Sequence, residues 1–255
     1  MDPGTLVRTR IHKLLLALSF PLLANCEDKK EPPPMRTDLV LSDEPRPAEA
    51  ASRVRPQLDR DLGEAGLRLG DPIFIRAFKE ENQVEIHVRN EISGKYDLFR
   101  TYKVAAASGT LGPKMSEGDG QVPEGFYHVP PGAMNPLSQF HLSFNIGFPN
   151  AYDQFHQRTG SLIMIHGNQV SLGCLAMTDP KIEEIYTLAD AALRNGQAFF
   201  RVHIFPFRMT DERMARASGS PHEEFWKNLR EGYALFEKNH IPPNVEVKDG
   251  RYIFE

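Results

Sequence analysis

From residue 72 onward, apolar residues occur in short runs that alternate with polar residues and are separated by Gly and Pro. A period of two is typical of strands with one buried face, and Gly and Pro favour the turns between strands. The segment 84–88 is the clearest example, because Val, Ile and Val alternate there with Glu and His. The pattern predicts strands at 73–78, 84–88, 96–107, 125–129, 140–146, 162–165 and 198–204.

One segment between the last two strands has the longer apolar period of a helix. At 179–195, Asp179 is the predicted N-cap and Gly196 follows the helix end. A single apolar face is formed by Ile182, Ile185, Tyr186, Ala189, Ala192 and Leu193. Many strands with one intervening helix favour a β-rich α+β domain over repeated βαβ units.

Residues 207–255 are predicted to form a C-terminal helical extension and hairpin that pack on this domain. The helix is expected at 221–239, where apolar residues recur at helical spacing, namely Phe225, Leu229, Tyr233 and Phe236. The dipeptide Asp249-Gly250 predicts a tight turn between two final strands.

The first 26 residues have the composition of an export signal. Basic residues at 8–13 precede an apolar run at 14–24, which is shorter than the ~20 residues of a membrane-spanning helix but suits a secretory signal. We therefore expect export to the periplasm. The run ends in Leu-Leu-Ala-Asn-Cys, which resembles a bacterial lipoprotein processing site with Cys26 as the lipidated residue. The alternative is a non-lipidated signal cut nearby, so membrane contact is expected only through the signal or a lipid anchor at Cys26.

Residues 27–56 are polar and rich in proline. Such a composition buries too little apolar surface to offset the entropy lost on ordering, and it predicts a disordered tether. The folded domain is therefore expected at 57–206, beginning with a short helix near 57–69.

Charge and cysteine content exclude several classes of function. The chain has 30 Lys and Arg against 34 Asp and Glu, a formal net charge of −4, and no concentrated basic block. This balance argues against nucleic acid as the main partner. Two cysteines cannot form a disulfide framework or a four-thiolate zinc site, and no histidine pair has zinc-like spacing with a third ligand in reach. We expect no metal.

The second cysteine, Cys174, lies in a segment with the residue types of nucleophilic catalysis. His166 precedes it at the end of a predicted strand, and a thiol needs a neighbouring base to become a thiolate near neutral pH. Gly173 would let an acyl carbonyl approach the backbone, whose amides can stabilise an oxyanion. Ser171 or a backbone carbonyl is expected to orient the imidazole. The alternative is a small buried cysteine beside a core histidine.

The order His166-Gly167, then Ser171-x-Gly173-Cys174, resembles the active-site signature of the L,D-transpeptidase catalytic family (YkuD-type fold) of bacterial cell-wall enzymes, specifically its YafK-like branch. Further short motifs resemble those of this branch and occur in the same order. They are Gly-Pro-Lys at 112–114, Glu-Gly-Asp-Gly at 117–120, Pro-Glu-Gly-Phe-Tyr at 123–127, Asn-Pro at 135–136, Phe-His-Leu-Ser at 140–143 and Phe-Pro-Asn-Ala at 148–151. The resemblance covers roughly 72–206, and the tail through 254 also resembles this branch.

The resemblance implies a mixed-sheet catalytic fold and a cysteine-dependent acyl transfer on peptidoglycan stem peptides, without a metal or organic cofactor. Cys174 would attack the carbonyl at the L-centre of diaminopimelate, with His166 as general base, and an amine or water would resolve the thioester. Backbone amides of Gly173 and Cys174 would hold the oxyanion. The residues expected to contact substrate are Gly167, His141, Asn150 and Met177.

Two positions depart from the family pattern. Many members have His where Leu172 stands and Arg where Ala176 stands, and they space the catalytic His and Cys further apart. Loss of the Arg removes a bidentate grip on a substrate carboxylate. Candidate replacements are Lys114, Arg201 and Arg208.

The missing Arg leaves a rival within the same fold, a hydrolase of amide links at diaminopimelate such as peptidoglycan–protein attachments. A non-catalytic murein-binding module is the alternative from another class. The joint presence of Cys174, Gly173, Ser171 and His166 argues against it.

Overall fold

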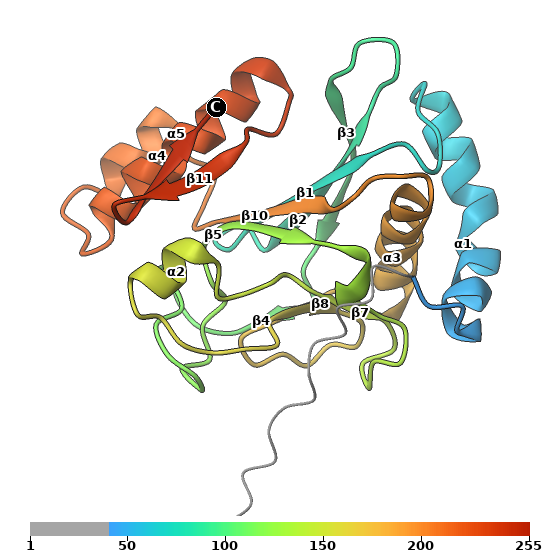
Figure 1. The fold of residues 1–255 in the computed structure, drawn as a ribbon, viewed down its shortest axis with the longest axis horizontal. Coiled ribbons are helices and arrows are strands. Elements are labelled where there is room, and N and C mark those ends of the chain that lie inside the picture. Colours follow the sequence, from blue (N-terminus) through green and yellow to red (C-terminus); the bar gives the residue numbers. More distant parts are fainter. Residues whose placement is uncertain (1–40) are drawn as a thin grey trace, which may run out of the picture. The chain divides into compact units, whose positions relative to one another are not determined.

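The computed structural model describes residues 41–255, and their first sheet has five strands in the order β3-β2-β1-β10-β5 (Figure 1). β1 and β10 are parallel, and the other neighbours are antiparallel. The strands are β1 (Ile73–Phe78), β2 (Gln83–Arg89), β3 (Tyr96–Lys103), β5 (Gly125–Val129) and β10 (Phe200–Phe205). The strand predictions at 73–78 and 125–129 are confirmed to the residue.

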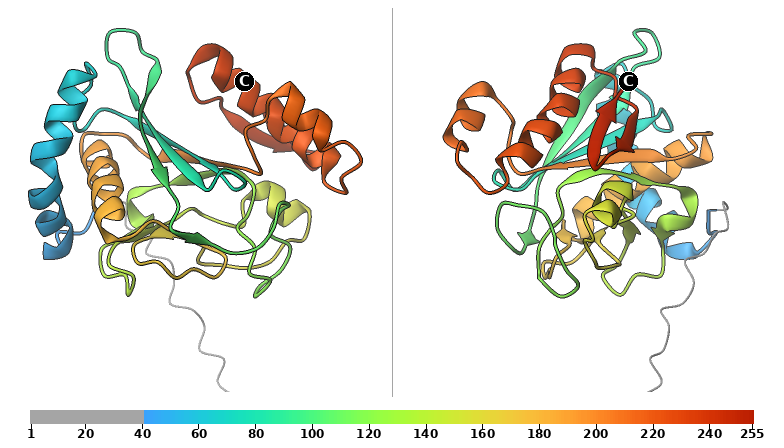
Figure 2. Two further views of the ribbon diagram at one scale, coloured as in Figure 1. Left: turned by 180° about the vertical axis from the view of Figure 1, so that it is seen from behind. Right: turned by 60° about the vertical axis from the view of Figure 1, so that its left-hand side comes forward.

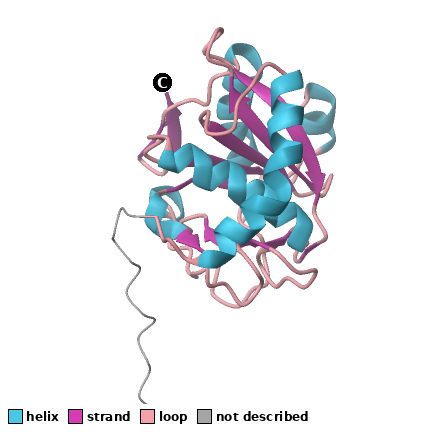
Figure 3. Ribbon diagram, turned by 90° about the vertical axis from the view of Figure 1, so that its right-hand side faces the viewer, coloured by secondary structure: helices cyan, strands magenta, loops and turns pink. Residues whose placement is uncertain are grey.

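The second sheet has five short strands in the order β4-β9-β8-β7-β6. They are β4 (Ala106–Ala107), β6 (Met134–Asn135), β7 (Ser143–Asn145), β8 (Met164–His166) and β9 (Leu175–Ala176). β8 and β9 are parallel neighbours, which places the segment around Cys174 beside the one that ends at His166. Long loops, pink in Figure 3, surround this sheet, together with α2 (Ala151–Phe155) and a 3-10 turn at Pro131–Ala133.

Two predicted strands are too long, for reasons visible in the backbone. The segment 96–107 is divided because the chain passes between the sheets: the Val104 N–H donates to Asn82 and the Ala105 N–H donates to Ala176. The segment 140–146 is shortened to β7 because His141 has a left-handed backbone, with φ of 67°.

α3 (Asp179–Arg194) and α1 (Pro45–Glu64) lie side by side, and both bury apolar residues in the core that the two sheets share (Figure 2). The six apolar side chains predicted for one face of α3 are all buried. None of the helices within 41–255 is long and apolar enough to cross a membrane.

The tether prediction is wrong for residues 45–56, which form the first part of α1. Prolines near a helix start are tolerated because the amides of the first turn have no partner within the helix. The buried side of α1 consists of Pro47, Ala50, Leu58 and Leu62, and this packing outweighs the proline content. The predicted signal at 1–26, Cys26 and the tether residues 27–40 lie outside the described residues.

The C-terminal extension comprises α4 (Asp211–Arg216), α5 (Glu223–Asn239) and a hairpin of β11 (Val245–Lys248) and β12 (Arg251–Phe254). It covers the face of the first sheet opposite α1 and α3 (Figure 2). A second apolar core forms there, with Phe78, Phe126 and Phe205 from the sheet side. The buried guanidinium of Arg76 joins Glu85 of β2 to Glu237 of α5 and fastens the extension to the sheet.

Candidate active site

Cys174 lies immediately before β9, beside Met164 of β8. The parallel register pairs His166 with Ala176, and the Met164 N–H donates to Cys174 Sγ at 3.3 Å. Cys174 therefore lies next to β8, two residues before the position that pairs with His166. The structure therefore brings the two predicted catalytic residues to neighbouring strands.

His166 ends β8 and is only 2% exposed. Its Nδ1 lies 2.6 Å from the carbonyl oxygen of Gly167, so in the neutral imidazole Nδ1 donates and Nε2 is an acceptor. Burial lowers the pKa of His166 below its usual 6.5, although the Gly167 carbonyl acts in the opposite sense. The ring of Phe140 packs on the imidazole with centroids 4.8 Å apart. The imidazole is thus a neutral, oriented base at neutral pH.

Gly167 is required by the space around it. A Cβ there would lie 2.6 Å from Asp179 Oδ1 and 2.7 Å from the carbonyl oxygen of Phe140. Asp179 does not cap α3 as predicted, since Thr178 holds the N-cap position without a side-chain bond. Its Oδ1 instead accepts the Asn168 N–H at 2.7 Å. Asp179 therefore anchors the turn that orients the base.

The amides of Gly173 and Cys174, which are expected to hold an oxyanion, are both hydrogen-bonded within the chain. The Gly173 N–H donates to Ser108 Oγ at 2.7 Å, and the Cys174 N–H donates to Ser171 Oγ at 3.1 Å. Ser171 Oγ also donates to the Cys174 carbonyl at 2.6 Å. Ser171 thus fixes the backbone of the nucleophile and leaves the orientation of the imidazole to Gly167.

The thiol and the imidazole form a neutral pair. Burial raises the pKa of Cys174 above its usual 9.0, while the Met164 N–H and the positive charge of Lys114 lower it in part. Within 41–255, the bonds of Cys174 Sγ are to Met164 and Leu162 and none is to His166. Proton transfer must then accompany attack on a substrate, because no preformed thiolate is stabilised.

Of the three candidate cations, Lys114 is the one whose charge acts on Cys174. Its Nζ is buried and donates to Asp119 Oδ1 at 2.6 Å and to the Ser116 carbonyl at 2.9 Å. Ala176 has no exposed surface and faces His166 across the strands. The positive charge near the thiol therefore comes from the loop that contains Lys114.

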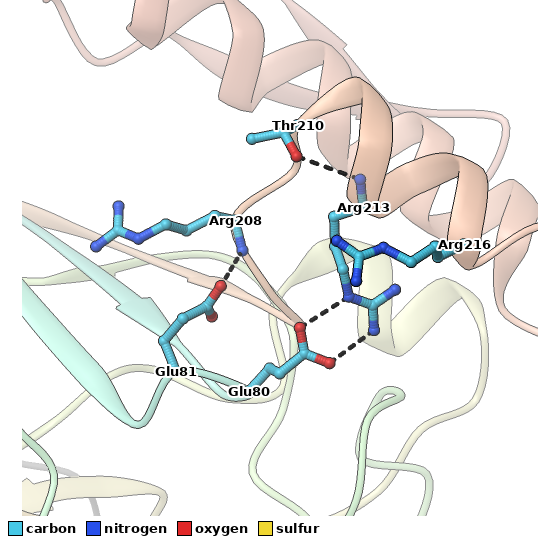
Figure 4. Close-up of a pocket in the computed structure, with 6 residues that line it drawn as sticks. All are labelled: Glu80, Glu81, Arg208, Thr210, Arg213 and Arg216. Atoms are coloured by element: carbon cyan, nitrogen blue, oxygen red, sulfur yellow. Dashed lines mark hydrogen bonds and ion pairs between the residues drawn. The ribbon is translucent and has the colours of Figure 1, made fainter.

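Arg201 and Arg208 are used elsewhere. Arg201 donates to Asn244 of the C-terminal extension. Arg208 donates through its guanidinium to Gln83 and Glu85 and through its N–H to Glu81. It lines a polar pocket with Glu80, Glu81, Thr210, Arg213 and Arg216 (Figure 4).

Three residues predicted to contact substrate serve the fold instead. Met177 has no exposed side-chain surface and belongs to the core. His141 Nε2 lies 2.8 Å from Glu183. Asn150 caps α2 and donates to Phe126 and Tyr252. No group of three His, Cys, Asp or Glu that suits a metal occurs in the described part of the chain.

Sequence reasoning missed two residues that touch the catalytic segment, Ser108 and Phe140. Phe140 belongs to the Phe-His-Leu-Ser motif at 140–143, and its aromatic side chain was the feature that could have indicated a contact with the site. Ser108 had no sequence signal, since its contact with Gly173 joins residues far apart in the chain. Apolar side chains on the same segments are also exposed, among them Leu162 at 59% and Leu172 at 80%.

The neutral pair predicts the pH dependence of thiol alkylation. We expect the rate of iodoacetamide addition at Cys174, followed by mass spectrometry of the Cys174 peptide, to rise about tenfold per pH unit from pH 6 to 8.5, because reaction requires the thiolate. No plateau should occur below pH 9, since the pKa of Cys174 is raised above that value. A rate that is already high and constant from pH 6 would show a preformed thiolate–imidazolium pair.

Comparison with known proteins identifies a family. The YkuD family model, described as the L,D-transpeptidase catalytic domain, matches residues 79–204. The chain is 44% identical over 185 residues to "Putative L,D-transpeptidase YafK" of Escherichia coli (strain K12), covering 72% of this chain and 74% of the relative.

Two solved structures are also similar. The helical cell shape determining protein Pgp2 from Campylobacter jejuni has 17% identity and a TM-score of 0.42, covering 75% of this chain and 80% of its own. Bd1075 of Bdellovibrio bacteriovorus has 19% identity and a TM-score of 0.36, covering 66% and 57%. On the family model and the extent of the Escherichia coli match, this chain belongs to the L,D-transpeptidase catalytic domain family.

Proposed function

We propose that the protein is a periplasmic cysteine acyl transferase that acts on peptidoglycan stem peptides at the L-centre of diaminopimelate. The observation that carries the proposal is the position of Cys174 beside the strand that ends at His166, with Nδ1 of that histidine held by Gly167. Membership of the family supports peptidoglycan as the substrate. Export is proposed from the apolar run at 14–24 alone.

In the proposed reaction, Cys174 Sγ attacks the carbonyl carbon at the diaminopimelate L-centre while His166 Nε2 takes the thiol proton. The tetrahedral intermediate collapses with loss of the amine of D-Ala, which receives that proton from the imidazolium. A thioester remains on Cys174. An acceptor amine or water then attacks it, gives its proton to His166 and restores the thiol.

The oxyanion formed in these steps needs donors, and the amide of Gly173 is one when the Ser108 hydroxyl leaves it. Ser108 Oγ also donates to the Gly120 carbonyl at 2.6 Å, so the loop that contains Lys114 and Asp119 holds this hydroxyl in place. We infer that the substrate oxygen replaces Ser108 Oγ at the Gly173 N–H. An occupied donor in the resting site keeps that N–H paired until substrate arrives.

Hydrolysis is the second candidate, and the buried Ala176 favours it. A leaving group with a free carboxylate, such as D-Ala, gains from a bidentate Arg, whereas an attached polypeptide offers no such carboxylate next to the scissile amide. Ala176 is fully buried and has no guanidinium, so bidentate binding of a carboxylate is absent at this position. The proposed alternative is an amidase that releases a polypeptide from diaminopimelate.

Product analysis separates the two reactions. Purified protein is incubated with disaccharide tetrapeptide, or with the same muropeptide bearing a peptide at the diaminopimelate L-centre, with and without an amine acceptor. We expect exchange of D-Ala for the acceptor, read by mass spectrometry. Release of the terminal group with addition of water, regardless of acceptor, would assign the hydrolase.

The Cys174→Ala variant is the control for both reactions, since it removes the nucleophile and little volume. Equal turnover by wild type and Cys174→Ala, or unchanged substrates with both, would exclude either enzymatic function.

Replacement of Ser108 tests the proposed donor. We expect Ser108→Ala to keep kcat within about threefold of wild type, because the amide of Gly173, and not the hydroxyl, holds the oxyanion. Loss of the resting hydrogen bond should lower the free energy of unfolding by about 1 kcal/mol in urea titrations. A fall in kcat of about 100-fold, the size expected for loss of an oxyanion donor, would show that the hydroxyl itself takes part.

A further inference from the structure

The C-terminal hairpin has two outer edges, and the hydrogen-bond register defines which groups face each. Asn244 and Glu255 exchange both of their backbone hydrogen bonds at 3.2 Å. In an antiparallel ladder such pairs alternate with pairs whose N–H and C=O groups point away from the partner strand. Val245 and Val247 of β11, opposite Phe254 and Tyr252, therefore direct their backbone groups outward.

The outer edge of β12 is closed by a side chain of α5. The Tyr252 N–H donates to Asn228 Oδ1 at 2.8 Å, and Asn228 Nδ2 donates to the Tyr252 carbonyl at 2.9 Å. The carboxamide of Asn228 thus replaces one residue of a neighbouring strand. The bonds of Tyr252 also agree with the register, because its backbone groups point away from β11.

The outer edge of β11 has no such cover. Within 41–255, the backbone N–H and C=O groups of Val245 and Val247 have no hydrogen-bond partner, and both residues are half-buried. An unpaired strand edge is a template for pairing with another chain. Asn228 thus closes the β12 edge at Tyr252, although not at Phe254, whereas the described residues leave the β11 edge unpaired at both Val245 and Val247.

This open edge faces a cavity of about 710 Å³ between the hairpin and the first sheet. Four successive residues of the hairpin strand, 244–247, line the cavity, as expected when a strand presents its edge and not one face. The opposite wall consists of residues from β5 and β10, among them His128, Arg201 and His203.

The arginine of the cavity wall has no carboxylate partner among the described residues. Arg201 is half-buried and donates to Asn244 Oδ1 at 2.6 Å, but no carboxylate within the described residues pairs with it. Its burial lowers the pKa of its guanidinium, so a nearby negative charge would be stabilising. The carboxylates of Glu246 and Glu255 line the same cavity from exposed positions at its rim.

His203 is the second unsatisfied group. It is 1% exposed and packed between the rings of Phe74 and Phe126, with centroids 4.6 and 4.7 Å away. Its Nδ1 is buried without a partner within 41–255. Because this atom is inaccessible, a ligand in the cavity can reach Arg201 but not His203 Nδ1, and His203 contributes to the wall through its packing.

We propose that the edge of β11 and this cavity bind an extended polypeptide as an added strand, with an acidic side chain directed to Arg201. Backbone hydrogen bonds to Val245 and Val247 supply affinity, and the guanidinium of Arg201 supplies selectivity for an acidic residue. The occupant is a protein segment, because regular strand pairing requires consecutive L-residues and stem peptides alternate in chirality. The proposal does not rest on the chemistry of Cys174.

Selection from a peptide library tests this surface directly. The full chain is immobilised and exposed to phage that display random peptides of about nine residues, long enough for a strand, with a central Asp. We expect enriched peptides on the wild type, and their loss on the double variant Val245→Pro and Val247→Pro. Proline removes only outward N–H groups at these positions, so the ladder with β12 stays intact. Val245→Thr with Val247→Thr is the matched control.

Synthetic copies of an enriched peptide give the magnitudes by fluorescence anisotropy. We expect the double proline variant to bind about 25-fold more weakly, at roughly fivefold for each of the two lost hydrogen bonds, and Arg201→Gln to bind about tenfold more weakly. N-methylation of alternate peptide residues should abolish binding to the unaltered protein, which separates lost hydrogen bonds from misfolding. Absence of enrichment would overturn the proposal. So would unchanged affinity of the double proline variant for the enriched peptide, or unchanged affinity of the wild type for the N-methylated peptide.

Discussion

The turn at His166-Gly167 is the constraint on which the catalytic arrangement depends. The Gly167 carbonyl holds the imidazole, and the absence of a side chain lets the turn pack against Asp179 at the start of α3. Asp179 in turn holds the Asn168 N–H. The chain then returns to form β9 parallel to β8, which brings Cys174 beside the strand of its base. One helix terminus thereby sets both the orientation of the base and the position of the nucleophile.

The same geometry describes a resting candidate site. Its thiol and imidazole are neutral for the same reason, since burial disfavours the charged form of each. Ser108 and Ser171 occupy the amides next to the thiol. In the proposed reaction, substrate binding supplies both the driving force for proton transfer and the oxygen that replaces the Ser108 hydroxyl at the Gly173 N–H. The buried Lys114 contributes positive potential at Cys174 while its own hydrogen bond goes to Asp119.

Local pattern predicted much of the fold and marked a candidate catalytic pair, but it did not predict the contacts between distant segments. β1, β5 and the apolar face of α3 follow from periodicity within one element. Cys174 and His166 were found because their residue types and spacing carry the chemistry. Met177 and the start of α1 were mistaken because burial by other elements decided their roles. Ser108 depends on a contact with Gly173 that no local pattern encodes.

The central claim is that an acyl group is carried on Cys174, and acid quenching during turnover of a disaccharide tetrapeptide tests it most directly. The account predicts a disaccharide-tripeptide adduct on the Cys174 peptide by mass spectrometry, absent at zero time and released by neutral hydroxylamine, as a thioester should be. Product formation without any adduct on Cys174, or with an adduct on another residue, would contradict the account.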